Sequence, residues 1–233
     1  ANMDNVEKLA QRGVTIIGPA SGIQACGDTG PGRMEQPETI IDQASAMFTN
    51  GVLQGKKVVI TAGPTREALD PVRYISNHSS GKMGYALATA AADAGADVVL
   101  ISGPVNLSIP DRCEHIPVIS ANEMLLAALE SAQKADVFIA TAAVADYRAV
   151  SVAAEKIKSG DGVLTINLEK NPDIVSTVAN TNESLFVVGF AAESTNVENY
   201  AKGKLKTKGL NAIIANDISR PDIGFDSDEN EVS

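Results

Sequence analysis

Short apolar runs alternate with helical segments along most of this 233-residue chain, and this alternation constrains the fold more than any other feature. The runs are too short for core helices, and most carry little outward polarity; they occupy residues 57–60, 98–101, 136–140, 186–190 and 212–215. Strands of this kind are typical of parallel sheets with both faces covered by helices. We therefore predict an α/β fold, a Rossmann-like doubly wound, mainly parallel sheet with helices on both faces.

Helical spacing of apolar residues between these runs predicts helices at residues 84–94, 121–134 and 196–208. Residues 164–168 (LTINL) instead alternate apolar and polar side chains, and they follow a turn sequence at residues 160–162 (GDG). That pattern predicts an exposed β-hairpin arm.

The first part of the chain follows a different pattern. We predict a strand at residues 14–17, a turn-rich surface loop at residues 18–32 that can close over a ligand, and a helix at residues 38–48. The regular alternation of strands and helices starts after that helix, so we place a domain boundary there. The chain then divides into residues 1–55 and residues 56–233.

Composition and charge exclude several classes of protein. The formal net charge is −10 and no long basic tract occurs, so nucleic acid is not expected as a partner. The two cysteines, Cys26 and Cys113, cannot form a disulfide framework, and no Cys/His spacing suggests structural zinc. No apolar stretch approaches membrane-spanning length and no signal-peptide core is present, so we expect no membrane association and a cytoplasmic location.

In the domain formed by residues 56–233, the sequence SSGKMG leads into the helix that follows the first strand. Its residue types favour the binding of an anion. The first N–H groups of a helix lack internal partners and carry the positive end of its dipole. Ser79 or Ser80 can cap those groups. Gly81 and Gly84 let a ligand approach the backbone, and Lys82 adds a full charge. We predict a phosphate site here; the alternative is an ordinary capped helix whose glycines only ease packing.

Small, polar or acidic residues follow several predicted strands, at the edge where ligands bind in doubly wound sheets. Gly63 and Thr65 follow the first strand of the main domain, and a run of small residues before Asp146 follows residues 136–140. The sequences GFAAE and AND end the last two strands. The residues alone therefore indicate a nucleotide- or phosphate-binding α/β domain and leave catalysis open.

Several motifs in order along the chain resemble phosphopantothenoylcysteine synthetase (phosphopantothenate–cysteine ligase). They are TAGPTREALDPVRYISNHSSGKMG, ATAAVADYRA, AEKIKS, KNPDIV, VGFAAE and ANDIS, and the resemblance covers about residues 56–233. In bacteria this family forms the C-terminal half of the bifunctional phosphopantothenoylcysteine decarboxylase/synthetase, a flavoprotein of coenzyme A biosynthesis. The resemblance implies a CTP-dependent synthetase domain that is C-terminally incomplete, because relatives carry a further hairpin and helix.

The sequence GPASGIQACGDTGPGRM is similar to the end of the decarboxylase domain of the same bifunctional family. The resemblance implies that residues 1–55 are a C-terminal remnant of that domain, with its substrate-flap loop and a linker helix. Cys26 then matches the decarboxylase proton donor. Because the rest of that domain is absent, FMN and decarboxylase activity are not expected in this fragment alone.

The synthetase resemblance implies a ligase that joins 4'-phosphopantothenate to L-cysteine. The carboxylate attacks the α-phosphate of CTP and expels pyrophosphate, and the cysteine amine then displaces CMP from the acyl-cytidylate. By the same resemblance, Lys156 stabilises charge on the nucleotide phosphates, Asn77 serves the second step, and Arg73 clamps a phosphate or carboxylate. Mg²⁺ would bridge phosphate oxygens, with no protein ligands assigned. The family is dimeric, and the alternating arm is the expected pairing element.

The resemblance also implies a set of nucleotide-binding residues. The CTP-binding set is Ala140, Thr141, Ala142, Asp146, Lys156, Asn171, Pro172, Asp173, Ile174, Phe190, Lys204 and Lys208. The predicted anion site adds, as substrate- and phosphate-binding residues, Ser80, Gly81, Lys82 and Gly84. From the residues alone, Asp173 is equally well explained as a first-turn carboxylate that the helix dipole favours.

Two other classes of protein fit part of the pattern. A Rossmann-type oxidoreductase explains the strand, glycine loop and helix, but it predicts an acidic residue at the end of the second strand. Ser102 and Gly103 stand there instead. A non-catalytic nucleotide-binding module keeps the strand-end residues but has no need of Lys156 and Asn77.

Overall fold

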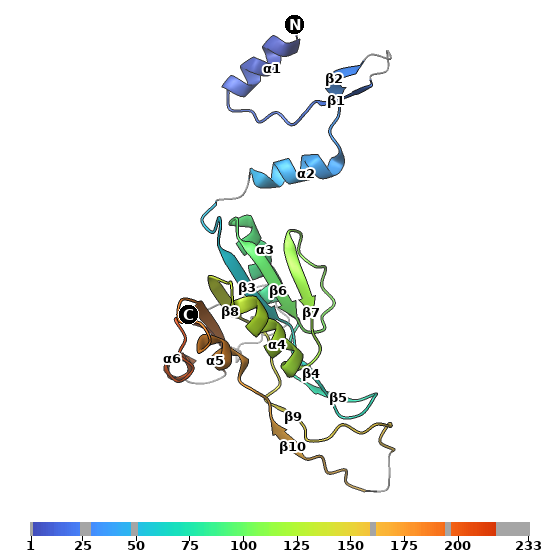
Figure 1. Cartoon of the computed structure of the whole chain (residues 1–233), viewed down its shortest axis with the longest axis vertical. Coiled ribbons are helices and arrows are strands. Elements are labelled where there is room, and N and C mark those ends of the chain that lie inside the picture. Colours follow the sequence, from blue (N-terminus) through green and yellow to red (C-terminus); the bar gives the residue numbers. More distant parts are fainter. Residues whose placement is uncertain (1, 24–28, 48–50, 159–161, 194–196, 218–233) are drawn as a thin grey trace. The chain divides into compact units, whose positions relative to one another are not determined.

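The computed structural model describes most of the chain, in two separate units. The described residues are 2–23, 29–47, 51–158, 162–193 and 197–217. Residues Ala1–Asn50 form one compact unit and Gly51–Ser233 form the other (Figure 1). The predicted proton donor Cys26 lies outside the described residues. None of the described helices combines the length and the apolar composition that crossing a bilayer requires.

The first unit contains two helices and one antiparallel hairpin. Its elements are α1 (Asn2–Gln11), β1 (Ala20–Ile23), β2 (Thr29–Arg33) and α2 (Pro37–Ala46). The helix predicted at residues 38–48 is present as α2, whereas the strand predicted at residues 14–17 is wrong. The loop predicted at residues 18–32 is wrong where β1 and β2 form a hairpin, and its residues 24–28 lie outside the described residues. Backbone groups need partners, and among the described residues no strand pairs with residues 14–17.

A six-stranded parallel sheet forms the centre of the second unit, in the order β12-β11-β8-β3-β6-β7. Its strands are β3 (Lys57–Ala62), β6 (Asp97–Ser102), β7 (Cys113–Pro117), β8 (Val137–Ala140), β11 (Phe186–Glu193) and β12 (Ala212–Asp217). Numbered along the chain, this order is the 3-2-1-4-5-6 order of the Rossmann fold. The predicted fold class is confirmed, and the order reverses between β3 and β8.

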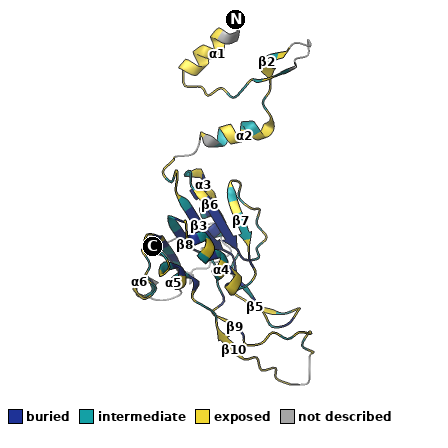
Figure 2. Cartoon of the chain, viewed as in Figure 1, coloured by how far each residue is buried: buried dark blue, intermediate teal, exposed yellow. Residues whose placement is uncertain are grey.

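Helices cover both faces of the sheet, which explains why its strands are apolar on both sides. The helices are α3 (Lys82–Asp93), α4 (Ala121–Ala132), α5 (Ile174–Ala179) and α6 (Val197–Thr207). Alternate strand residues enter two cores, which Figure 2 shows as the dark centre of the unit. Val59 and Phe138 pack with α4 and α5 on one face, while Ile60 and Leu100 pack with α3 on the other.

Two short antiparallel hairpins extend from the sheet. They are β4 (Arg66–Ala68) with β5 (Tyr74–Ser76), and β9 (Tyr147–Ala149) with β10 (Leu168–Lys170). β4 and β9 lie side by side (Figure 1). The sequence prediction of an arm is correct in kind, but its strand at residues 164–168 is wrong except for Leu168. The reason is that the ladder with β9 begins only at the pair Leu168–Ala149, so residues 164–167 have no partner strand among the described residues.

Asp136 ties the beginning of β3 to the beginning of β8. Its carboxylate accepts hydrogen bonds from Lys56 Nζ and from the backbone N–H of Lys57, each at 2.8 Å. The hydrogen bond from Lys56, and then that from Lys57, hold the pKa of Asp136 below its ordinary value of 3.8. A carboxyl with a lowered folded-state pKa stabilises the fold above its unfolded-state pKa, and this contribution is lost as the pH falls through the folded-state pKa.

We expect Asp136→Asn to flatten the acid limb of the stability profile. The wild-type unfolding free energy should fall as the pH drops below about 4, and the variant should lack part of this fall. Denaturant unfolding at a series of acidic pH values measures it, with Asp97→Asn at the start of β6 as the matched control. Identical slopes for the wild type and Asp136→Asn would contradict the assignment.

Candidate functional site

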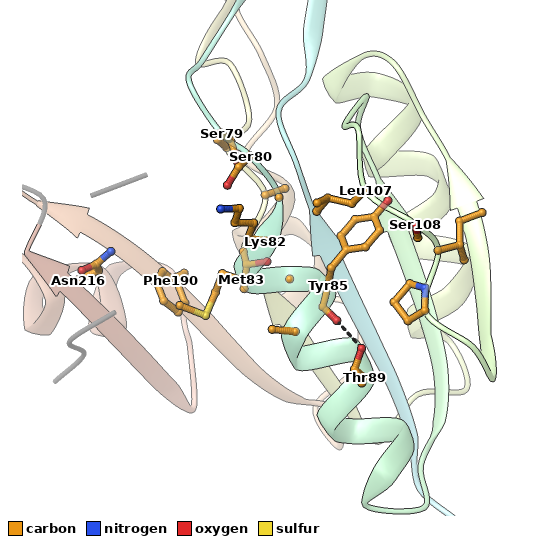
Figure 3. A pocket seen from close by; sticks show the side chains of 18 of the residues that line it. Ser79, Ser80, Lys82, Met83, Tyr85, Thr89, Leu107, Ser108, Phe190 and Asn216 are labelled. Atoms are coloured by element: carbon orange, nitrogen blue, oxygen red, sulfur yellow. Dashed lines mark hydrogen bonds between the residues drawn. The ribbon is translucent and has the colours of Figure 1, made fainter. Parts of the chain in front are cut away.

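A cavity of about 820 Å³ lies at the carboxyl ends of the parallel strands, where the strand order reverses. This is the position at which doubly wound sheets bind their ligands. Figure 3 shows Lys82 and Met83 at the start of α3, Leu107 to one side, and Phe190 and Asn216 from β11 and β12 to the other. The lining consists of residues 79–86, 89, 107–111, 141–143, 190 and 216.

The amino end of α3 faces this cavity without a side-chain cap. Gly81 is the N-cap residue, with a left-handed φ of 78°, and as a glycine it offers no side-chain cap to the first turn. Gly81, and neither of the predicted residues Ser79 and Ser80, holds the N-cap position of α3, and both serines line the cavity. A Cβ at Gly81 would lie 2.8 Å from Val105 Cγ1, so this backbone conformation and close packing both favour glycine. The result is a helix start whose positive end is open to an anion.

Gly84 brings the first turn of α3 directly onto the two central strands. A Cβ at this position would stand 2.5 Å from Ala62 Cβ and 2.6 Å from Thr141 Oγ1. Because there is no Cβ, helix α3, the end of β3 and the end of β8 meet at one point. The anion-binding end of the helix is thereby placed at the strand ends.

The loops that follow β3 and β8 are joined by hydrogen bonds at the same point. Thr141 Oγ1 donates to the Thr61 carbonyl at 2.6 Å, and the Ala143 N–H donates to the Gly63 carbonyl at 2.9 Å. The side-chain amide of Asn77 donates to the Val144 carbonyl at 3.0 Å. Asn77 is thus held beside two parts of the lining, residues 79–80 and 141–143.

Asn216 is a lining residue that the sequence predictions did not select. It is only 6% exposed, and its Oδ1 accepts no hydrogen bond from any described residue. Burying an unpaired acceptor is unfavourable, so the amide is poised for a donor from a ligand. Its place as a polar residue at the end of the last parallel strand was the available signal.

The cavity gathers some of the predicted residues and not others. Those that line it are Ser80, Gly81, Lys82, Gly84, Thr141, Ala142 and Phe190. Those outside the described lining are Arg73, Asn77, Ala140, Asp146, Lys156, Asn171, Pro172, Asp173, Ile174, Lys204 and Lys208. The Ile174 side chain is buried in the core beside α4, and Ala140 is buried at the end of β8.

Two of the outlying residues pair with each other. Lys208 Nζ lies 3.0 Å from Asp173 Oδ2, and Asp173 caps α5 by accepting from the Ser176 N–H at 3.0 Å. Burial raises the pKa of Asp173, but the hydrogen bonds from Ser176 and Lys208 outweigh it, so the net pKa is lowered. The end of α6 is thereby attached to the start of α5.

Asn171 connects the hairpin β9–β10 to the loop after β8. Its side-chain amide donates to the Ala145 carbonyl at 2.8 Å, and its backbone N–H donates to the Asp146 carbonyl at 2.8 Å. Lys156 lies on the exposed segment after β9, and Lys204 lies half-buried on α6. None of these three residues belongs to the described lining of the cavity.

Comparison with known proteins identifies relatives over the whole chain. The family model described as "DNA/pantothenate metabolism flavoprotein C-terminal domain" matches residues 53–233. The chain is 54% identical over 236 residues to the coenzyme A biosynthesis bifunctional protein CoaBC of Vibrio parahaemolyticus, covering 100% of the chain and 59% of that relative. It is 56% identical to the CoaBC protein of Escherichia coli strain K12, and the match covers 99% of this chain and 58% of that relative.

A solved structure agrees with these relationships. The crystal structure of the C-terminal domain of a CoaBC protein matches with a TM-score of 0.65 and 48% identity, over 72% of this chain and 80% of that one. The chain spans only 59% and 58% of the full lengths of these two curated relatives. The chain therefore belongs to the family of DNA/pantothenate metabolism flavoprotein C-terminal domains.

Proposed function

We propose that the second unit is a phosphopantothenate–cysteine ligase that uses CTP through an acyl-cytidylate and releases pyrophosphate and CMP. The observation that carries the proposal is the cavity at the switch point of the sheet. It combines the start of α3 at Gly81, which has no side-chain cap, the small residues Thr141 and Ala142, and the Asn216 Oδ1, which accepts no hydrogen bond from the described residues. Family membership and relatives named for coenzyme A biosynthesis support the substrate class.

We assign the parts that such a reaction requires to individual residues. The start of α3 and the charge of Lys82 favour the binding of substrate phosphates beside the strand ends. Asn77 presents an amide that can donate to a carbonyl oxygen without competing as a nucleophile. Lys156 would stabilise the negative charge that develops as pyrophosphate leaves, and Arg73 would clamp a phosphate or carboxylate. Together these groups bind the two substrates, orient the carboxylate and stabilise the leaving charge.

Mg²⁺ is not assigned to protein ligands in this proposal. Among the residues that the structure describes, no group of three or more His, Cys, Asp or Glu side chains is arranged to hold a metal ion. The described residues therefore do not fit a protein-built magnesium site. Magnesium bound mainly by substrate phosphates is the arrangement compatible with this composition.

The remaining parts of the proposal concern the first unit and assembly. We assign residues 1–55 to the end of a decarboxylase domain, with Cys26 as its proton donor. A homodimer through the β9–β10 hairpin would cover apolar side chains that are exposed in the single chain, such as Val150 at 57% and Val152 at 56%. Sedimentation measures this, and a monomer at micromolar concentration would argue against the dimer.

The oxidoreductase alternative receives no support from the end of β6. Ser102 stands where dinucleotide-binding folds place an acidic ribose ligand. Its hydroxyl accepts from Tyr85 Oη at 3.1 Å and donates to the Gly103 carbonyl at 2.8 Å. Both hydrogen bonds are made within the protein, so the hydroxyl proton is not available to a ribose.

Pyrophosphate release from CTP tests the proposed function. The assay contains 4'-phosphopantothenate and magnesium, with and without L-cysteine. A ligase should release pyrophosphate stoichiometrically without cysteine and catalytically with it. CTP binding without release in either case would indicate a binding module, and the absence of CTP binding would overturn the proposal for this chain.

We expect Asn216→Leu to weaken CTP binding without destabilising the fold. The variant removes a buried amide oxygen that accepts no hydrogen bond from the described residues, so the free protein loses no described bond to that oxygen, whereas the ligand loses a hydrogen bond worth about tenfold in affinity. Calorimetric titration and denaturant unfolding measure the two effects. The matched control is Asn211→Leu at the other end of β12, because Asn211 Oδ1 accepts from the Val187 N–H at 2.7 Å. That control should lose stability and keep its affinity, and the reverse pattern would refute the assignment of Asn216.

A further inference from the structure

Asp70 is a buried carboxylate in the turn between β4 and β5, only 3% exposed. Its Oδ1 accepts hydrogen bonds from the backbone N–H groups of Val72 and Arg73, each at 2.7 Å. The Leu69 N–H donates to the Arg73 carbonyl at 2.9 Å and closes the same turn. One oxygen of Asp70 therefore shapes the hairpin that carries Arg73 and leads to Asn77.

The other oxygen of Asp70 reaches a distant part of the chain. Oδ2 accepts from the backbone N–H of Ile157 at 3.0 Å, across 87 positions of sequence. A second hydrogen bond, from the Ala153 N–H to the Leu69 carbonyl at 2.9 Å, joins the same two segments. Ile157 is the chain neighbour of Lys156, so the contact determines where the Lys156 backbone lies.

The carboxylate is held in its charged form at this junction. Burial opposes the ionisation of Asp70, but the three backbone N–H donors and the nearby Arg73 guanidinium, 3.7 Å away, outweigh burial and lower the pKa. An ionised carboxylate accepts several hydrogen bonds at once, which an amide or a hydroxyl cannot match in the same geometry.

We propose that Asp70 is a positioning residue: it holds the Lys156 segment against the hairpin that presents Arg73 and Asn77, and so sets the relative positions of these three groups. The inference rests on the proposed function, because Arg73, Asn77 and Lys156 matter only if the chain carries out the ligation. Asp70 acts through backbone contacts and does not need to touch substrate. A displacement of about 1 Å in a catalytic group can cost roughly 100-fold in rate, which makes such a junction consequential.

Asp70→Asn separates the contact of Asp70 with its own turn from its contact with Ile157. The amide oxygen still accepts from the two N–H groups of the turn, while the amide NH₂ faces the Ile157 N–H and cannot accept from it. We expect the rate constant for cysteine-independent pyrophosphate release to fall by about 100-fold, with a change in CTP affinity of less than about threefold. Asp93→Asn, at a surface carboxylate paired with Arg112, is the matched control and should keep the wild-type rate.

A double-mutant cycle with Lys156→Ala distinguishes positioning from a general structural role. If Asp70 acts through Lys156, the double variant releases pyrophosphate no more slowly than Lys156→Ala alone. If the wild type is active and the rate losses of the two single variants add in the double variant, this inference is overturned and the proposed function stands. A wild type that releases no pyrophosphate would overturn both. If Asp70→Asn does not fold, Asp70→Ser replaces it in the cycle, because the serine hydroxyl still accepts from the turn but is too short to reach Ile157.

Discussion

Replacing Lys156 by alanine is expected to slow cysteine-independent pyrophosphate release from CTP by about 10²- to 10³-fold. The expected loss is large because the ammonium group is proposed to stabilise charge that develops only as pyrophosphate leaves, so that its removal acts on the transition state. CTP affinity should change much less than the rate. Single-turnover measurements with 4'-phosphopantothenate in excess give the rate constant, and equilibrium titration gives the affinity.

Lys158→Ala is the matched control for that experiment. Lys158 is also exposed, lies in the same segment and carries the same charge, so a general loss of positive charge would affect both variants equally. The proposal requires a loss at Lys156 alone. Because Lys156 does not line the described cavity, a selective loss would also mean that this segment reaches the nucleotide during turnover. Equal rates for the wild type and Lys156→Ala would remove Lys156 from the catalytic set.

Gly84→Ala is expected to destabilise the second unit by roughly 1–3 kcal/mol and to abolish CTP binding. In a helix interior the change from glycine to alanine normally stabilises by roughly 0.5–1 kcal/mol. Here the new methyl group would stand 2.5 Å from Ala62 Cβ and 2.6 Å from Thr141 Oγ1, so α3 has to move away from β3 and β8. That movement displaces the anion-binding start of the helix from the strand ends.

Gly203→Ala is expected to have the opposite effect on stability, on another helix of the same unit. Gly203 is exposed in α6, and a Cβ there would meet no atom within 4 Å. Alanine should therefore raise the unfolding free energy by about 0.5–1 kcal/mol. Denaturant unfolding measures both variants, and CTP titration follows for Gly84→Ala. If Gly84→Ala also stabilised the protein, the close approach of α3 to the central strands would be refuted.

Part of the candidate site could be located from the sequence, because strand ends are visible as breaks in an apolar run. The glycines at the start of α3, the residues Thr141 and Ala142 after β8, and Phe190 in β11 all line one cavity. What the sequence could not supply was which strand ends are neighbours. The predicted residues on α5, on α6 and after β9 lie outside the described lining, because motif order along a chain carries no distances.

The helix cap shows the same limit at short range. Ser79 and Ser80 have the residue types that cap helices, yet α3 begins at Gly81 in a left-handed conformation with no side-chain cap. Tertiary packing against Val105 and the loop after β3 decides this position. Propensity describes what a residue favours in isolation, and here the contacts of the neighbouring loops outweigh it.

The sequence by itself determined the class of fold and the edge of the sheet at which the cavity lies. Hydrophobic periodicity depends on which faces are covered, and runs apolar on both sides require helices on both faces. Only the tertiary structure decided the strand order, the start of α3 at Gly81, the burial of the Asn216 amide oxygen without a described donor, and the junction at Asp70. The physical reason is the sequence separation of the contacting residues. Asp70 and Ile157 are 87 positions apart, and no local pattern encodes a hydrogen bond across that separation.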